Sequence, residues 1–145
     1  MNDATPRPAH LGWRIAAAIY DFFPLLALWM ATGAASIAVT GGTLDYHVWW
    51  YRLLLLAVTA GYFVLSWRYG GQTIGMRAWR LRVVGRDGVS PDWVASLLRF
   101  GVAQVSLAVL CIGFLWCLFD RERRGWHDLA SGTRVLRLPR QKAVA

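Results

Sequence analysis

Asp21 is the side chain in this sequence that most plainly needs a chemical explanation. It lies within residues 15–39, an almost wholly apolar stretch that is long enough, at ~1.5 Å of helix per residue, to cross a hydrocarbon layer of ~30 Å. Arg14 precedes it by seven residues, which is two helical turns, so the two side chains lie on one helix face. A carboxylate at membrane depth costs ~2.5 kcal/mol or more. We therefore expect Asp21 to have a charged partner or a function.

The other reactive side chains do not indicate catalysis or metal binding. His127 and Asp128 are adjacent, but no Ser or Cys nucleophile stands in a recognisable motif, and we expect the two to fix the C-terminal segment by hydrogen bonds. Cys111 and Cys117 are six residues apart, a spacing that turns them away from one another on a helix. The sequence predicts no catalytic residue, no metal, no cofactor and no enzymatic activity.

The composition is that of a membrane protein. Apolar residues make up 57% of the 145 residues, they occur in long blocks, and nine residues are Trp. The net charge of +8 comes from Arg residues that flank these blocks, a pattern typical of cytoplasmic membrane flanks in contact with anionic lipid head groups. We therefore expect the lipid bilayer as partner and no binding to nucleic acid.

The apolar blocks divide the chain into a membrane domain, residues 13–138, an N-terminal tail, 1–12, and a C-terminal tail, 139–145. The domain contains three apolar blocks and one long polar loop: blocks at 13–39, 48–67 and 93–119, and a loop at 68–92. The tail before the first block is expected to be flexible. Residues 41–47 contain no Lys or Arg, as expected of an external loop.

Short β-prone runs and turn signals lie between and after the blocks. Residues 79–84 and 133–138 favour strands that could pair if both lie on one side of the membrane. The segment before the third block predicts a helix start with Ser90 as N-cap and Pro91 in the first position.

The third block poses a topological problem. If it crosses the membrane once, the loop at 68–92, with five Arg, and the C-terminal segment, with six Arg and one Lys, lie on opposite sides, against the positive-inside rule. A re-entrant helical hairpin with its bend near residues 111–113 would leave the N-terminus, the loop and the C-terminus all cytoplasmic. We favour the hairpin, with a full span as the alternative. The expected fold is an all-α membrane protein with two transmembrane helices, this hairpin and a small cytoplasmic β element.

Depth in the membrane suggests the charge partners. Asp21 lies ~12 Å and Arg99 ~10 Å from the same edge when each is counted along its helix. The hypothesis is that Asp21 pairs with Arg99, and that Arg14, nearer the surface, faces Asp120 or Asp128.

Taken together, these residues resemble the RDD family of small bacterial membrane proteins, named for one arginine and two aspartates. The match covers about residues 11–138. The positions that carry it are Arg14 and Asp21, the loop residues Gly71, Gln72, Thr73 and Gly75, then Arg99, Asp120, His127, Asp128, Gly132 and Thr133. We assign the second aspartate to Asp128, with Asp120 as its rival. The resemblance implies the bacterial cytoplasmic (inner) membrane, and some members are linked to sodium–proton exchange.

Two functions follow as hypotheses. The first is a transport or ion-exchange component that carries protons or monovalent cations through Asp21, which requires a homo-oligomer because so few spans cannot enclose a pathway. The second is a membrane accessory or scaffold protein whose basic surface contacts anionic lipid or partner proteins. In that case Asp21 forms a structural ion pair, and a carboxylate neutralised by Arg is poorly placed to bind a cation.

Overall fold

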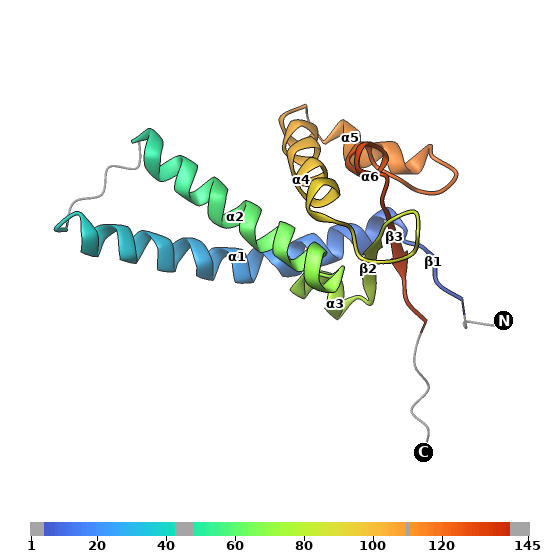
Figure 1. The fold of residues 1–145 in the computed structure, drawn as a ribbon, viewed down its shortest axis with the longest axis horizontal. Coiled ribbons are helices and arrows are strands. Elements are labelled where there is room, and N and C mark those ends of the chain that lie inside the picture. The colour runs from blue at the N-terminus through green and yellow to red at the C-terminus, as the bar shows by residue number, and fades with distance from the viewer. Residues whose placement is uncertain (1–4, 43–47, 110, 140–145) are drawn as a thin grey trace, which may run out of the picture.

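The computed structural model describes residues 5–42, 48–109 and 111–139 and consists of a long helical hairpin joined to a lobe of short helices and strands (Figure 1). The hairpin is formed by α1 (Leu11–Val39) and α2 (Trp49–Gly70). Most of the expected external loop, at 43–47, and nearly all of the C-terminal tail, at 140–145, lie outside the described residues.

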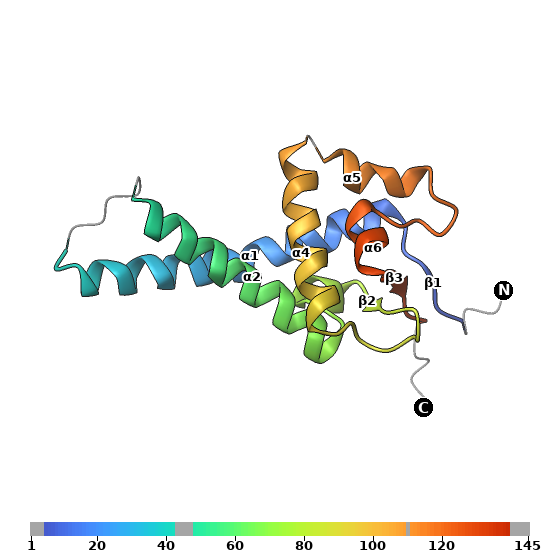
Figure 2. The ribbon, with the colours of Figure 1, turned by 45° about the horizontal axis from the view of Figure 1, so that its top comes forward.

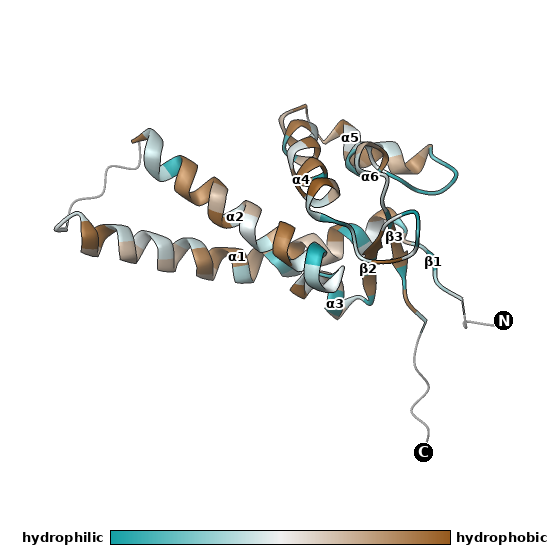
Figure 3. Cartoon of the chain, viewed as in Figure 1, coloured by the Kyte–Doolittle hydropathy of each residue, from teal (hydrophilic) through white to brown (hydrophobic). Residues whose placement is uncertain are grey.

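Helices α1 and α2 are both long and apolar enough to cross a membrane, as the sequence predicts. Apolar residues recur along both helices (Figure 3), and large apolar side chains such as Phe23 and Met30 are about two-thirds exposed. Burying such surface in lipid is favourable. Helix α2 extends three residues beyond the expected end because Gly71, with φ of 65°, provides the left-handed C-cap and donates its N–H to Trp67.

The third apolar block is broken where the sequence predicts a bend. It forms α4 (Trp93–Ala108), α5 (Ile112–Leu115) and the 3₁₀ turn η1 (Trp116–Leu118), with an angle of 111° at the break. Helix α4 stands across the base of the hairpin, with α5 and α6 (Trp126–Ser131) on its other side (Figures 1 and 2). The re-entrant hairpin stays a prediction.

The start of α4 differs from the prediction. Asp92, not Ser90, is the N-cap, and its side chain accepts a hydrogen bond of 2.7 Å from the backbone N–H of Ala95. The prediction of Pro91 in the first helical position was therefore wrong, because a carboxylate two residues after Ser90 is an equally suitable cap.

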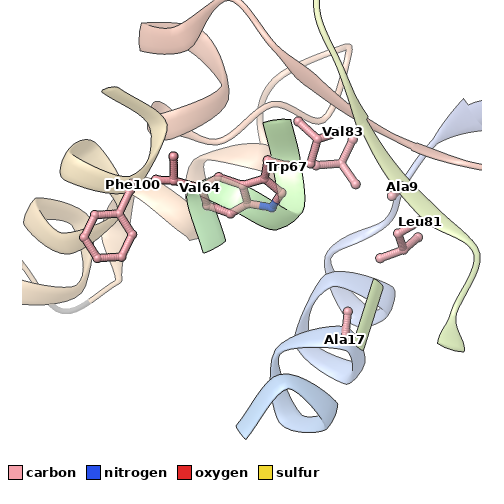
Figure 4. Close-up of a cluster of buried hydrophobic side chains, with 8 residues drawn as sticks. Ala9, Ala17, Val64, Trp67, Leu81, Val83 and Phe100 are labelled. Carbon is pink, nitrogen blue, oxygen red and sulfur yellow. The ribbon is translucent and has the colours of Figure 1, made fainter. Parts of the chain in front are cut away.

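A three-stranded antiparallel sheet joins three distant parts of the chain. Its order is β1 (Arg7–Pro8), β3 (Arg134–Arg137), β2 (Leu81–Val84), which confirms that the two β-prone runs pair. The expectation of a flexible N-terminal tail was wrong for its last residues. Ala9 donates its N–H to Val135 and is fully buried, because it packs in the core shown in Figure 4 with Leu81 and neighbouring side chains.

The loop after α2 contains a short helix that the sequence did not predict, α3 (Ile74–Ala78). The Thr73 hydroxyl caps it by accepting a hydrogen bond of 3.1 Å from the N–H of Met76. Helix α3 packs directly on α1, and a Cβ placed on Gly75 would lie 2.0 Å from the carbonyl oxygen of Ala17. Only glycine allows this close approach.

We expect Gly75→Ala to destabilise the protein by about 1–3 kcal/mol or more, because α3 must move away from the backbone of α1. The measurement is thermal unfolding of the full chain in detergent, followed by circular dichroism. Gly101→Ala in α4 is the matched control, since a Cβ there meets nothing within 4 Å. Equal melting temperatures for the two variants would contradict the packing.

Candidate functional site

The centre of the lobe is the carboxylate of Asp128, which is fully buried between two arginines. Arg14, from the first turn of α1, donates to Asp128 Oδ2 at 2.5 Å, and Arg99, from α4, donates to Oδ1. The backbone N–H of Gly125, at the start of α6, also donates to Oδ2 at 2.9 Å. Three elements distant in sequence therefore meet at one side chain.

Arg99 is almost completely buried and has contacts on several sides. Besides Asp128, its guanidinium donates to the hydroxyl of Thr133 at 2.7 Å. It also lies over the ring of Trp67, 4.9 Å from the ring centroid, in a cation–π contact. Arg99 thus connects α4 with α2, α6 and the residue before β3.

The predicted pairing of Asp21 with Arg99 was wrong. The sequence gives the depth of a residue along its helix but not the direction in which it points. Helix α6 packs on α4 and places Asp128 against Arg99, whereas Asp21 faces α2 and α3. Of the two partners predicted for Arg14, Asp120 and Asp128, the structure shows an ion pair with Asp128.

Burial and the two arginines together determine the charge states of Asp128 and His127. Burial alone would raise the pKa of Asp128, but the positive charges of Arg99 and Arg14 outweigh it and hold the pKa well below its usual range. Burial, followed by the charge of Arg99, lowers the pKa of His127 to about 3, so its imidazole is neutral at pH 7. The 3.6 Å contact between His127 and Asp128 is therefore not an ion pair at neutral pH.

The second buried carboxylate, Asp21, is held by neutral groups. The hydroxyl of Tyr62 on α2 donates to Oδ1 at 2.6 Å, and that of Thr73 donates to Oδ2 at 2.5 Å. The backbone N–H of Gly75 adds a hydrogen bond of 2.8 Å to Oδ1. Asp21 is 3% exposed, and among the described residues no Lys, Arg or His lies within 4.0 Å of its oxygens.

Sequence reasoning did not single out Tyr62. The available signal was a phenol within a mostly apolar span, where an unpaired hydroxyl would be costly and a polar partner is therefore expected.

The other candidate residues hold the lobe together or lie at its surface. Asp120 forms a partly exposed ion pair with Arg124, at 3.1 Å, and lies outside the buried cluster. Gln72 donates to the carbonyl of Leu81 at 2.7 Å, and Gly132, with φ of 63°, ends α6. Within the ranges that the structure describes, no three His, Cys, Asp or Glu side chains gather as a metal site.

This fold, with two buried carboxylates among the described residues, defines a small helical protein with two candidate membrane spans. The model of the RDD family matches residues 8–132, and the chain belongs to the RDD family. The match includes Arg14, Asp21, Arg99 and both rival aspartates. No curated protein and no solved structure matches the chain.

We expect Arg99→Ala to lower the free energy of unfolding by about 3–5 kcal/mol, because it leaves Asp128 buried with only one of its two ion-pair partners. Arg124→Ala, which removes a partly exposed ion pair, is expected to cost at most ~1 kcal/mol. In double-mutant cycles Arg99→Ala should couple to Asp128→Asn and add independently to Asp21→Asn. Coupling to Asp21 instead would contradict the observed pairing.

The pKa of His127 predicts acid sensitivity. Between about pH 6.5 and about pH 3 the unfolded chain binds a proton at His127 that the folded chain does not, so stability falls as the pH falls through this window. Asp128 adds to the loss only below its unfolded pKa of ~4. We expect His127→Gln to reduce the change in melting temperature between pH 6.5 and pH 4.5. A profile as steep as that of the wild type would show that His127 is not responsible.

Proposed function

We propose that this protein is a component of proton or monovalent cation transport, with Asp21 as the carboxylate that binds the ion. The observation that supports it is the buried state of Asp21 without a cationic side chain beside it among the described residues. A buried carboxylate of this kind is costly when charged, and a proton or a monovalent cation removes that cost.

The two arginines that would have made Asp21 a structural ion pair are both bound to Asp128. The three groups that do hold Asp21 are neutral, and two of them are hydroxyls, of Tyr62 and Thr73. A hydroxyl can rotate from donating a hydrogen bond to presenting its oxygen. Four oxygen atoms meet here: the two carboxylate oxygens of Asp21 and the hydroxyl oxygens of Tyr62 and Thr73. Oxygen atoms of these types bind hard cations.

The transport proposal requires more than one copy of the chain, because two spans and a bent third block do not enclose a pathway. We propose a homo-oligomer in the membrane, with contacts through small residues on the spans. Gly61 on α2 is one such position, since a Cβ there would meet nothing within 4 Å and a second helix can approach closely.

The proposed location is the bacterial inner membrane, with both termini cytoplasmic and the third block re-entrant. The sheet supports this topology. Its strands come from before α1, from between α2 and α4, and from after α6, and strands that share hydrogen bonds must lie on the same side of a membrane.

The alternative is a non-transporting scaffold, and one observation favours it. The three hydrogen bonds to Asp21 fasten α2 and α3 to α1, which is a sufficient structural role for a buried carboxylate. In both proposals the protein is not an enzyme.

We expect liposomes that contain the full chain to show cation-driven proton movement, and Asp21→Asn to reduce the flux at least ~10-fold while the protein still folds. Asp120→Asn is the matched control, since it makes the same change at a partly exposed ion pair outside the cluster. Absence of flux in the wild type, or unchanged flux in Asp21→Asn, would overturn the transport proposal. Loss of folding in Asp21→Asn alone would favour the scaffold.

A further inference from the structure

A groove on the lobe is lined by arginines that Asp21 and the buried cluster do not use. Two adjoining cavities, of about 250 and 590 Å³, share a wall formed by Gly85, Arg86, Gly132 and Thr133. The first also touches Arg134, and the second also touches Arg68 at the end of α2. The larger cavity has the size of a site for a small ligand.

The sheet register brings these arginines together. Val84, the last residue of β2, pairs with Arg134, the first residue of β3, so Arg86 leaves the sheet at the same end. Arg86 lies against the end of α6, since a Cβ on Gly132 would be 3.3 Å from Arg86 Nε. A side chain at this position would require Arg86 to shift by a few tenths of an ångström.

The acidic residues that line the groove are already engaged. Asp128 binds Arg14 and Arg99, and Glu122 lies 3.5 Å from Arg124. Asp92 caps α4, and Asp87 accepts a hydrogen bond from the N–H of Val89 within its own turn. None of these four carboxylates forms an ion pair with Arg68, Arg86 or Arg134.

Three of the four arginines that line the two cavities have no carboxylate within 4.0 Å among the described residues: Arg68, Arg86 and Arg134. Arg86 and Arg134 are exposed, and the Nε of Arg68 is shielded from solvent without a hydrogen-bond partner. A planar guanidinium with free N–H donors is well suited to bind a phosphate group. Each guanidinium can donate two parallel hydrogen bonds to two phosphate oxygens.

We propose that this groove, referred to here as the Arg86 groove and defined by Arg68, Arg86, Gly132 and Arg134, is a binding site for a phosphate group. The phosphate belongs either to the head group of an anionic lipid or to a small soluble molecule. The site is independent of Asp21 and of ion transport. Arg68 ends a candidate span, which puts one wall of the groove near the level where lipid head groups lie.

The first arm of the test uses inorganic phosphate and the full chain in a neutral detergent, with binding measured by calorimetry. The second uses nanodiscs of phosphatidylcholine with or without phosphatidylglycerol, with bound lipid counted by native mass spectrometry. The variant is Arg86→Gln/Arg134→Gln, and the control is Arg7→Gln, which removes an exposed Arg outside the groove.

We expect the double variant to weaken binding at least ~10-fold in one of the two arms, and the control to change it less than ~2-fold. Loss of phosphate binding in detergent identifies a soluble ligand, and loss of retained phosphatidylglycerol alone identifies a lipid. Circular dichroism of each variant verifies folding, and Arg86→Lys, which keeps the charge, should keep part of the affinity. No binding by the wild type in either arm, or equal losses in the variant and the control, would overturn the proposal.

Discussion

The structure depends on the burial of one carboxylate, that of Asp128. A fully buried carboxylate is costly unless its oxygens are hydrogen-bonded, and cationic partners reduce that cost further. Here Arg14 and Arg99 each take one oxygen, and the N–H of Gly125 shares one of them. Since these groups come from α1, α4 and the start of α6, satisfying Asp128 fixes the position of the lobe on the base of the hairpin. The sheet adds a second connection between the same parts of the chain.

The two buried aspartates are stabilised by different kinds of partner. Asp128 is neutralised by permanent cations that hold its pKa low, so its charge does not change under physiological conditions. Asp21 is surrounded by hydroxyls and one backbone N–H, none of which carries charge. The first arrangement is suited to holding a fold together. The second leaves the charge of the carboxylate open to compensation by a small ion, and this difference is why the proposed function rests on Asp21.

Much of this architecture is predictable from sequence, and most of the failures concern contacts between distant parts of the chain. Long apolar runs specify α1 and α2, and β-prone runs specify β2 and β3, because each signal is local and extends over several residues. The pairing of Asp21 with Arg99 failed because depth along a helix carries no information about which neighbour packs on which face. That choice is made by α3 and α6, helices of five and six residues whose stability comes from tertiary packing. Strand β1 has two residues and no periodicity to detect.

A continuous set of contacts joins the two aspartates. Thr73 and Gly75, which hold Asp21, lie in the segment between α2 and β2, and this segment is anchored where the N–H of Val83 donates to the carbonyl of Gly71 at 2.7 Å. Strand β2 pairs with β3, which begins directly after Thr133, a partner of Arg99. The sheet therefore connects the segment that holds Asp21 with the cluster around Asp128.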